Sequence, residues 1–362
     1  MAGPQRNSPL LGTALVVGGC GFVGYHIVRH LLQDADCASL YVFDRTVHHN
    51  RLDGVTYVQG DITDAEALQS FISKVQPTVL FHTASPIASS RRRGDFVETN
   101  IHGTKHLLDA ASQCASVKAF VFTSSVDVYT NPPHSNVAEN HPLWRPDDYS
   151  NEYRRTKAVG EAIVLAANST KLPTVALRLA HAYGERHVQG LQEMYDMFSK
   201  GQKLVQIGQG HNVMEVASAD NCASAHILAA KALIDPSLAR GKVDGEAFNV
   251  SDGAPVPFWH HTRIVWLGFR SEEDVKQRLI LPAWIMVLVV HLTEWLLWMF
   301  TLGTISPQTA LSRTSLEYCL YSHTYDISRA RENLGFSPVV DHDRVLADSV
   351  AWFMRQVQGI GS

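Results

Sequence analysis

The sequence predicts an α/β fold, a doubly wound parallel sheet with helices on both faces, and three observations predict it. Short apolar runs alternate with segments of helical periodicity from Thr13 to about Val250, as expected of repeated βαβ units. A glycine-rich turn follows the first apolar run and opens a helical segment. An acidic residue, Asp44, ends the second run. We also expect a smaller region after this core, because the composition changes beyond Trp259 to a charged and then a very apolar segment.

The individual elements follow from their periodicity. Apolar runs bounded by turn residues predict seven strands, at Ala14–Val17, Leu40–Phe43, Thr56–Gln59, Thr78–His82, Ala119–Thr123, Thr174–Arg178 and Ala247–Val250. Phe22–Gln33 places its apolar residues on one helical face, so we expect it to pack on the sheet. Thr130–Ser150 holds four prolines and many polar residues, which predicts a long loop, and loops of that length are usually functional.

The composition favours a globular, intracellular protein. The chain has 362 residues, and 45% of them are hydrophobic, which is enough for a sizeable core. A formal net charge of -4 offers no basic field for nucleic acid, and we expect the run Arg91, Arg92, Arg93 to be a solvated loop. The five cysteines show no CxxC spacing, so neither a metal site nor a disulfide framework is predicted. Met1–Leu11 lacks the pattern of a secretory signal.

Gly18, Gly21 and Gly24 form a GxxGxxG motif between the first predicted strand and the first predicted helix. Glycines at this spacing let the backbone approach a pyrophosphate, which then lies at the positive end of the helix dipole. The carboxylate of Asp44 would accept hydrogen bonds from the adenosine ribose and repel a 2′-phosphate, which favours NAD over NADP. Arg45 beside it would instead favour a phosphate and NADP. The motif predicts a dinucleotide site of the Rossmann type.

Tyr153 and Lys157 are four residues apart, so on a helix they project from one face. A phenol with an ordinary pKa of about 10 is a poor base at neutral pH, and an ammonium beside it favours the phenolate. Ser125 ends a predicted strand, and ligands of open α/β sheets bind beyond the carboxyl ends of strands, so its hydroxyl would face the same reacting oxygen. The three residues predict acid/base chemistry on an alcohol or carbonyl group. A surface tyrosine above a lysine is the alternative.

Two further groups of residues are candidates for the cofactor site or the proton relay, and each also has a purely structural explanation. Asp61 and Ile62, after Gly60, would place a carboxylate and an apolar side chain against adenine, or would form a simple turn. Asn100, at the expected start of a helix, would hold a water that relays protons to Lys157, or would serve as a helix N-cap.

Together with further motifs, these residues resemble those of the extended short-chain dehydrogenases and, within them, the 3β-hydroxysteroid dehydrogenase family. The motifs are GxxGxxG, Gly60-Asp61, His82-Thr83-Ala84-Ser85, Asn100 with Gly103-Thr104, Thr123-Ser124-Ser125, Tyr153 with Lys157, and Leu177-Arg178 with Tyr183-Gly184. The likeness runs from about Thr13 to Trp352 and is closest to the fungal decarboxylating sterol-4α-carboxylate 3-dehydrogenases. One departure is Leu179, where members of the family usually have a proline near the nicotinamide.

The resemblance implies an NAD-dependent dehydrogenase that acts on a secondary alcohol of a sterol or related triterpenoid. Tyr153 becomes the acid/base, Lys157 its electrostatic partner, which also reaches the nicotinamide ribose, and Ser125 the hydroxyl donor. The implied cofactor contacts are Gly18, Gly21, Phe22, Val23, Gly24, Asp44, Asp61, Ile62, Thr83, Ala84, Ser85, Asn100, Tyr153 and Lys157.

On a 3β-hydroxy-4α-carboxylate, oxidation at C3 would give a β-keto acid, which loses CO2 without a metal because the new carbonyl accepts the electrons. The substrate carboxylate needs a cation nearby, and His181, Arg186 and His187 are the candidates. The alternatives are a 3β-hydroxysteroid dehydrogenase or lipid alcohol dehydrogenase without decarboxylation, a sugar-nucleotide epimerase or dehydratase, and a dinucleotide sensor without catalysis.

The segment from Pro282 to Leu302 is long and apolar enough to cross a bilayer. A crossing would separate His323–Phe336 from the core that it is expected to complete, so we expect insertion without crossing, with tryptophans at the interface. Glu294 and His291 would be costly in hydrocarbon unless they face protein or water. The alternative is a buried helix that lines a sterol pocket. Both interpretations indicate a lipophilic substrate.

These inferences define an expected organisation of the chain. Residues 1–12 form a tail, and residues 13–185 the dinucleotide-binding core, completed by about 246–252 and the C-terminal region. The substrate-binding region comprises 186–245 and 253–325, and residues 326–362 form helices that pack on the core. We expect the protein at the cytosolic face of the endoplasmic reticulum membrane, with a cytoplasmic location as the alternative. Expected partners are the substrate, a possible second copy of the chain and other sterol-pathway enzymes.

Overall fold

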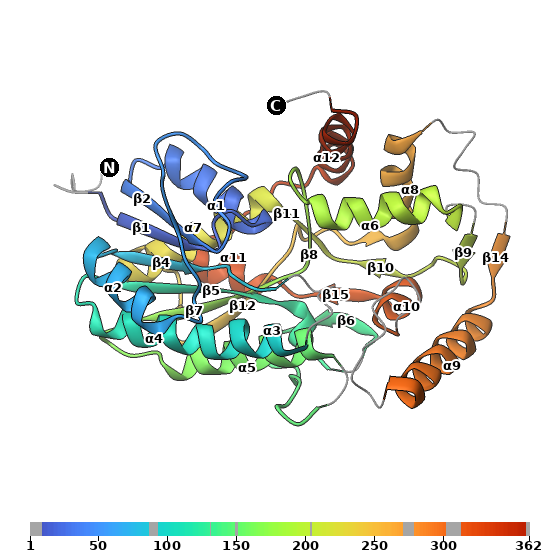
Figure 1. Cartoon of the computed structure of the whole chain (residues 1–362), viewed down its shortest axis with the longest axis horizontal. Helices are drawn as coiled ribbons and strands as arrows, with labels where there is room; N and C mark the ends of the chain where they lie inside the picture. The colour runs from blue at the N-terminus through green and yellow to red at the C-terminus, as the bar shows by residue number, and fades with distance from the viewer. Residues whose placement is uncertain are drawn as a thin grey trace.

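A seven-stranded parallel sheet forms the centre of the molecule in the computed structural model (Figure 1). The structure describes residues 9–86, 93–130, 132–148, 151–202, 205–270, 279–301 and 313–359. The strand order is β12-β7-β5-β4-β1-β2-β3, with the bounds β1 Gly12–Val17, β2 Cys37–Asp44, β3 Thr56–Gln59, β4 Val79–His82, β5 Ala119–Ser125, β7 Thr174–Leu179 and β12 Glu246–Val250. All seven predicted strands are present, so the predicted doubly wound sheet is confirmed.

Helices cover both faces of this sheet (Figure 1). One face carries α1 (Phe22–Gln33), α7 (Ala219–Ile234) and α11 (Ser328–Leu334). The other face carries α2 (Ala65–Val75), α4 (Thr104–Gln113) and α5 (Glu152–Ala166), while α3 (Arg93–Val97) leads through a π-helical turn, Glu98–Gly103, into α4. Each layer shares an apolar cluster with the sheet, and burial of these faces is the main stabilising contribution. The predicted helix over residues 22–33 is confirmed.

A second group of elements adjoins the sheet on one side (Figure 1). Its largest sheet has the order β13-β10-β15-β6, and two strand pairs, β11-β8 and β14-β9, accompany it. The bounds of these strands are β6 His134–Val137, β8 His181–Tyr183, β9 Val205–Ile207, β10 Val213–Met214, β11 Val216–Ser218, β13 Val256–Pro257, β14 Leu279–Leu281 and β15 His323–Tyr325. The helices are α6 Val188–Ser199, α8 Phe258–Phe269, α9 Ala283–Thr301, α10 Arg313–Leu320 and α12 His342–Val357. Short 3-10 turns lie at Val126–Val128 and Pro236–Leu238.

The segment Thr130–Ser150 is not a loop throughout, so that part of the sequence prediction was wrong. Its residues 134–137 form β6, which pairs in parallel with β15, and Tyr129 forms a bridge with Leu143. The partner strand lies almost 190 residues further along the chain. Only Val137 of β6 is apolar, so no local periodicity predicts a strand there.

Helix α9 presents most of its apolar side chains to solvent. Met286 and Val290 are buried and pack against Leu316 of α10. The exposed fractions of its three tryptophans, Trp284, Trp295 and Trp298, are between 57% and 67%. Among the described helices, α9 alone is long and apolar enough to cross a membrane. The alternative prediction, a buried helix, is therefore wrong for residues 283–301.

Some predictions concern residues outside the described part of the chain: Arg91 and Arg92, the charged segment Ser271–Arg278, Met1–Ser8 and Leu302. The predicted division into core, substrate region and C-terminal part stays a prediction. Within the described residues, α7 packs on α1, α11 packs on α7 and β12, and α12 packs on α6 and α8.

Candidate active site

The turn between β1 and α1 contains glycines that have no room for a side chain, so backbone atoms form its surface. Gly18 has a φ of +84°, which side chains rarely tolerate, and a Cβ on it would lie 2.6 Å from the backbone nitrogen of Ala84. A Cβ on Gly24 would lie 2.2 Å from the carbonyl oxygen of Gly18. Gly21 is the N-cap of α1 and is exposed. The free N–H groups of the first helical turn are thus available to an anion.

The carboxylate of Asp44, at the end of β2, is held against this turn. One oxygen accepts a hydrogen bond from the backbone N–H of Cys20 at 3.0 Å, and the other accepts one from Thr46 at 3.2 Å. Within the described residues, Asp44 forms no ion pair, and its neighbour Arg45 does not pair with it either. The position of the carboxylate fits the ribose contact predicted from the sequence.

Other predicted cofactor contacts gather at the same edge of the sheet. The hydroxyl of Thr83, after β4, donates to the carbonyl of Gly18 at 3.1 Å, and Ala84 lies directly against that glycine. Phe22 stacks on His187 with ring centroids 4.5 Å apart. Val23 packs on the apolar core. The bare turn, the helix N-terminus and an unpaired carboxylate together fit a dinucleotide.

The remaining predicted contacts have local roles in the structure. One carboxylate oxygen of Asp61 accepts from both the N–H and the hydroxyl of Thr63 at 2.9 Å, as in an ordinary turn. Ile62 is buried, and a Cβ on Gly103 would lie 2.5 Å from it. The Ser85 hydroxyl donates to the next carbonyl along the chain at 3.1 Å. Their contact with a cofactor stays a prediction.

Tyr153, Lys157 and Ser125 meet where β5 ends and α5 begins. The side chain of Asn151 caps α5 by accepting from the backbone N–H of Tyr153 at 2.9 Å, which fixes the tyrosine in the first helical turn. The Ser125 hydroxyl lies beside the phenol of Tyr153 and acts on it as a hydrogen-bond donor that lowers its pKa. Lys157 is buried one turn later and donates to the carbonyl of Thr123 at 2.9 Å. The predicted helical pairing and strand end are both present.

The electrostatics of these groups differ in one respect from the sequence prediction. Burial raises the pKa of Tyr153 well above its usual value, the charge of Asp127 raises it further, and the hydrogen bond from Ser125 opposes both. Burial lowers the pKa of Lys157 to about 8, against the charge of Glu161. The pKa of the phenol is therefore raised, where the sequence prediction expected Lys157 to lower it, because burial of the phenol has the largest effect.

An ionic network that the sequence analysis missed adjoins Ser125. The backbone N–H of Asp127 donates to the Ser125 hydroxyl at 3.1 Å, and that hydroxyl lies 3.5 Å from the carboxylate of Asp127. The same carboxylate accepts from the hydroxyl of Tyr318 at 3.1 Å and lies 3.5 Å from the guanidinium of Arg154. Arg154 also donates to Glu317 at 2.9 Å. Helix α10 is thereby linked to Ser125 through Asp127, across a sequence distance that no motif spacing encodes.

Asn100 does not cap a helix, so that alternative was wrong. The helix begins at Arg93, and Asn100 lies inside it in the π-helical turn. Its amide nitrogen donates to the hydroxyl of Thr156 at 3.0 Å, and its amide oxygen is buried and has no hydrogen-bond partner in the described part of the chain. A buried amide oxygen of this kind is suited to hold a water.

The three candidate cations are not equivalent. Arg186 donates to Asn50 at 3.0 Å and lies 4.3 Å above the ring of Tyr25. Burial lowers the pKa of His187 to about 3, and the ring stacks on Phe22. Burial also lowers the pKa of His181, although the charge of Asp127 opposes this shift, and part of the residue is exposed. The His181 ring lies 6.4 Å from that of Tyr318, whose hydroxyl donates to the Asp127 carboxylate beside Ser125, so His181 is the candidate with a contact path to Ser125.

Residues 15–281 match the 3-beta hydroxysteroid dehydrogenase/isomerase family. Among similar proteins, the sterol-4-alpha-carboxylate 3-dehydrogenase, decarboxylating, of Gibberella zeae is 30% identical over 81% of this chain and 97% of that protein. The human protein of the same name is 28% identical over 93% of this chain and 87% of that protein.

Several solved structures share this fold. A UDP-glucose 4-epimerase from Thermotoga maritima superposes with a TM-score of 0.71 at 20% identity, over 95% of this chain and 99% of that one. The Bordetella bronchiseptica enzyme WbmG in complex with NAD gives a TM-score of 0.68 at 21% identity, over 96% and 95% of the two chains. At these identities the likeness concerns the fold alone.

Proposed function

Because the chain belongs to the 3-beta hydroxysteroid dehydrogenase/isomerase family, we propose that it oxidises the 3β-hydroxyl of a 4α-carboxy sterol or related triterpenoid and releases the carboxylate as CO2. The observation that carries the proposal is the convergence of Tyr153, Ser125 and the buried Lys157 where β5 ends and α5 begins. Relatives named sterol-4-alpha-carboxylate 3-dehydrogenase, decarboxylating, which match most of the chain, support the substrate class.

The cofactor in this proposal is a nicotinamide dinucleotide, with NAD favoured over NADP. Asp44 supports this choice, because its carboxylate forms no ion pair within the described residues and would repel a 2′-phosphate. The glycine turn Gly18–Gly24 would hold the pyrophosphate. A bound nicotinamide would supply the acceptor for the hydride that leaves C3 of the substrate.

Side chains of the protein would then remove the proton of the C3 hydroxyl and pass it to solvent. Phenolate Tyr153 removes the proton of the C3 hydroxyl as the carbonyl forms, while the Ser125 hydroxyl donates a hydrogen bond to the same oxygen. Lys157 supplies positive charge one helical turn away and would bind the nicotinamide ribose. Asn100 would hold a water beside Thr156 that passes the proton onwards.

Decarboxylation follows from the product of the oxidation. The C4–carboxylate bond breaks, its electron pair moves into the enolate formed with the C3 carbonyl, and CO2 leaves. Ser125 and the protonated Tyr153 stabilise the developing negative oxygen, and a proton then adds at C4. No metal is required for these steps. His181 would donate to the substrate carboxylate, because it lies exposed beside Tyr318.

The lipophilic substrate agrees with the surface of α9. We propose that α9 inserts into a membrane without crossing it, at the cytosolic face of the endoplasmic reticulum, since its tryptophans are exposed and its buried residues contact α10. Residues 186–245 and 253–325 would form the substrate-binding region between this helix and the dinucleotide site.

A substrate panel tests the proposal. The purified chain is incubated with NAD and one of three compounds: a 3β-hydroxy-4α-carboxysterol, the matching sterol without the carboxylate, or a sugar nucleotide. NADH is followed by absorbance, and the product is identified by mass spectrometry. We expect NADH and a decarboxylated 3-ketone from the acid. Oxidation of the plain sterol alone would favour a 3β-hydroxysteroid dehydrogenase without decarboxylation, and turnover of a sugar nucleotide alone would overturn the substrate class.

A further inference from the structure

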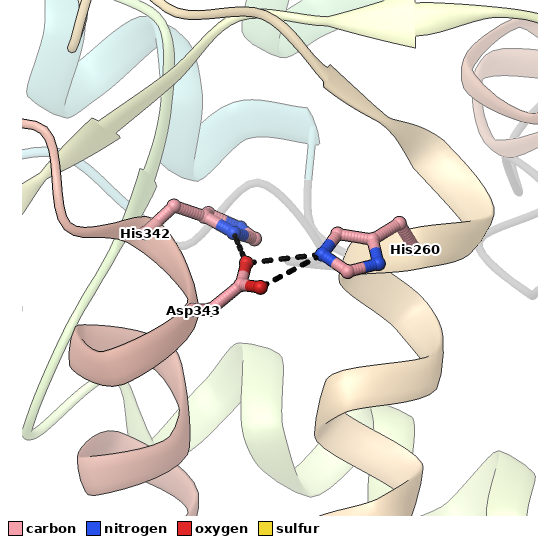
Figure 2. A group of neighbouring side chains, drawn as sticks. All are labelled: His260, His342 and Asp343. Carbon is pink, nitrogen blue, oxygen red and sulfur yellow. Dashed lines mark hydrogen bonds and ion pairs between the residues drawn. The ribbon is translucent and has the colours of Figure 1, made fainter.

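Three side chains from two helices converge where α12 begins (Figure 2). His342 and Asp343 are the first residues of α12, and His260 lies in the first turn of α8. The Nδ1 of His342 lies 2.7 Å from one oxygen of Asp343, and the Nε2 of His260 lies 3.0 and 3.1 Å from the two oxygens. All three ligand atoms lie within 4.8 Å of one another. From this arrangement we infer that the chain has a binding site for a divalent transition-metal ion, best suited to Zn2+, outside the dinucleotide and catalytic sites.

The distances suit such an ion. Zinc binds imidazole nitrogen and carboxylate oxygen at about 2.0–2.2 Å, so tetrahedral ligand atoms lie roughly 3.3 Å apart. The contacts of Asp343 with His260, at 3.0 Å, and with His342, at 2.7 Å, are shorter than that separation by about 0.3 and 0.6 Å, so a small outward shift of the carboxylate would admit the ion. Two imidazoles and one carboxylate leave a fourth position for water. Calcium and magnesium prefer all-oxygen sites, so nitrogen ligands favour zinc and its neighbours.

A third histidine, His261, lies behind the site and contacts His342. The Nε2 of His342 lies 2.9 Å from the Nδ1 of His261, and both rings are buried. When the Nδ1 of His342 binds a metal, its Nε2 carries the proton and donates to His261, which must then be neutral.

Two of the three proposed ligands are exposed, so a metal ion can reach the site from solvent. The side chains of His260 and Asp343 are 41% and 64% exposed, while that of His342 is 6% exposed. The nearest guanidinium on α12, that of Arg344, pairs with Asp341 and lies 3.7 Å from Asp348, so it leaves the carboxylate of Asp343 to the histidines. A bound ion would link α8 to α12, two helices about 80 residues apart in the sequence.

Metal binding to the untagged full-length chain tests the site directly. After treatment with a chelator, the chain is titrated with Zn2+ by calorimetry and with Co2+ by visible absorption, which reports tetrahedral coordination. His260→Ala and Asp343→Asn remove one ligand each at exposed positions. His211→Ala and Asp348→Asn make the same chemical changes at exposed residues outside the cluster.

We expect one Zn2+ per chain in the wild type and both control variants, and an affinity roughly 10- to 100-fold weaker or lost in the two ligand variants. Absence of saturable binding in the wild type would overturn the inference, as would equal affinity in all variants. Circular dichroism of each variant checks that the fold is kept. Because the readout is metal binding and not turnover, the result is independent of the proposed reaction.

Discussion

The guanidinium of Arg178 in β7 donates three hydrogen bonds of 2.6 to 3.1 Å to the carboxylate of Glu161 in α5, and both side chains are buried. Glu161 also accepts from Ser124 at 2.6 Å, and Arg178 donates to the hydroxyl of Tyr129 at 2.8 Å. The pair therefore fixes α5, with its tyrosine and lysine, against the strand that carries Ser125.

Loss of one member should destabilise the fold. We expect Glu161→Ala to lower the free energy of unfolding by about 3–5 kcal/mol, because Arg178 is left as an unpaired buried charge. Denaturant unfolding measures the change. Glu193→Ala, at an exposed position of α6, should change it by less than about 0.5 kcal/mol. Equal stability of the two variants would contradict the assigned role.

Asp127 should control the pH dependence of oxidation. Its negative charge raises the pKa of Tyr153, and oxidation requires the phenolate, so the rate falls as pH drops below that pKa. In Asp127→Asn the charge is lost, the pKa of Tyr153 falls, and the acid side of the kcat profile should move to lower pH. A profile that is unchanged or moves to higher pH would contradict this assignment.

Removal of the phenol hydroxyl should separate binding from chemistry. We expect Tyr153→Phe to lower kcat by about 10²- to 10⁴-fold, as for loss of a general base, with little change in the Kd for NAD. Tyr321→Phe removes a hydroxyl from a residue that is 41% exposed and serves as the control. Substantial turnover in Tyr153→Phe would refute the role of Tyr153.

Asp44 should determine the choice of cofactor. In Asp44→Asn the ribose loses a charged acceptor, which is worth about 1.5–3 kcal/mol, so the KM for NAD should rise roughly 10- to 100-fold while that for NADP falls or is unchanged. Initial rates with both cofactors measure the ratio. If the wild type already prefers NADP, Arg45 and not Asp44 sets the preference.

Helix α9 should carry the chain to membranes. Flotation with phosphatidylcholine vesicles should recover the wild type with the lipid, and a variant with Trp284, Trp295 and Trp298 changed to serine should stay in the soluble fraction. The double change of the exposed Val339 and Val340 to serine serves as the control, since it removes apolar surface elsewhere. Flotation of all three proteins alike would exclude α9 as the contact.

The sequence predicted what depends on local pattern and failed where contacts span the chain. The seven sheet strands and α1 have strong periodicity and turn signals, and the structure contains them. β6 is largely polar and depends on pairing with β15, and the helix around Asn100 continues through a π-helical turn, so neither has a local signal. At the site, the pairing of Tyr153 with Lys157 follows from helix geometry. The contacts of Asp127 with Tyr318 and Arg154 arise only from the packing of α10.

The most direct test of the central claim follows the hydride and the carboxylate together. The substrate is a 4α-carboxysterol with deuterium at C3 and a labelled carboxyl carbon, and both the nicotinamide and the released gas are examined by mass spectrometry. The account predicts one deuterium on the reduced nicotinamide for each labelled CO2 released, and neither product with Tyr153→Phe. Deuterium transfer without labelled CO2, or deuterium retained at C3 of the product, would contradict it.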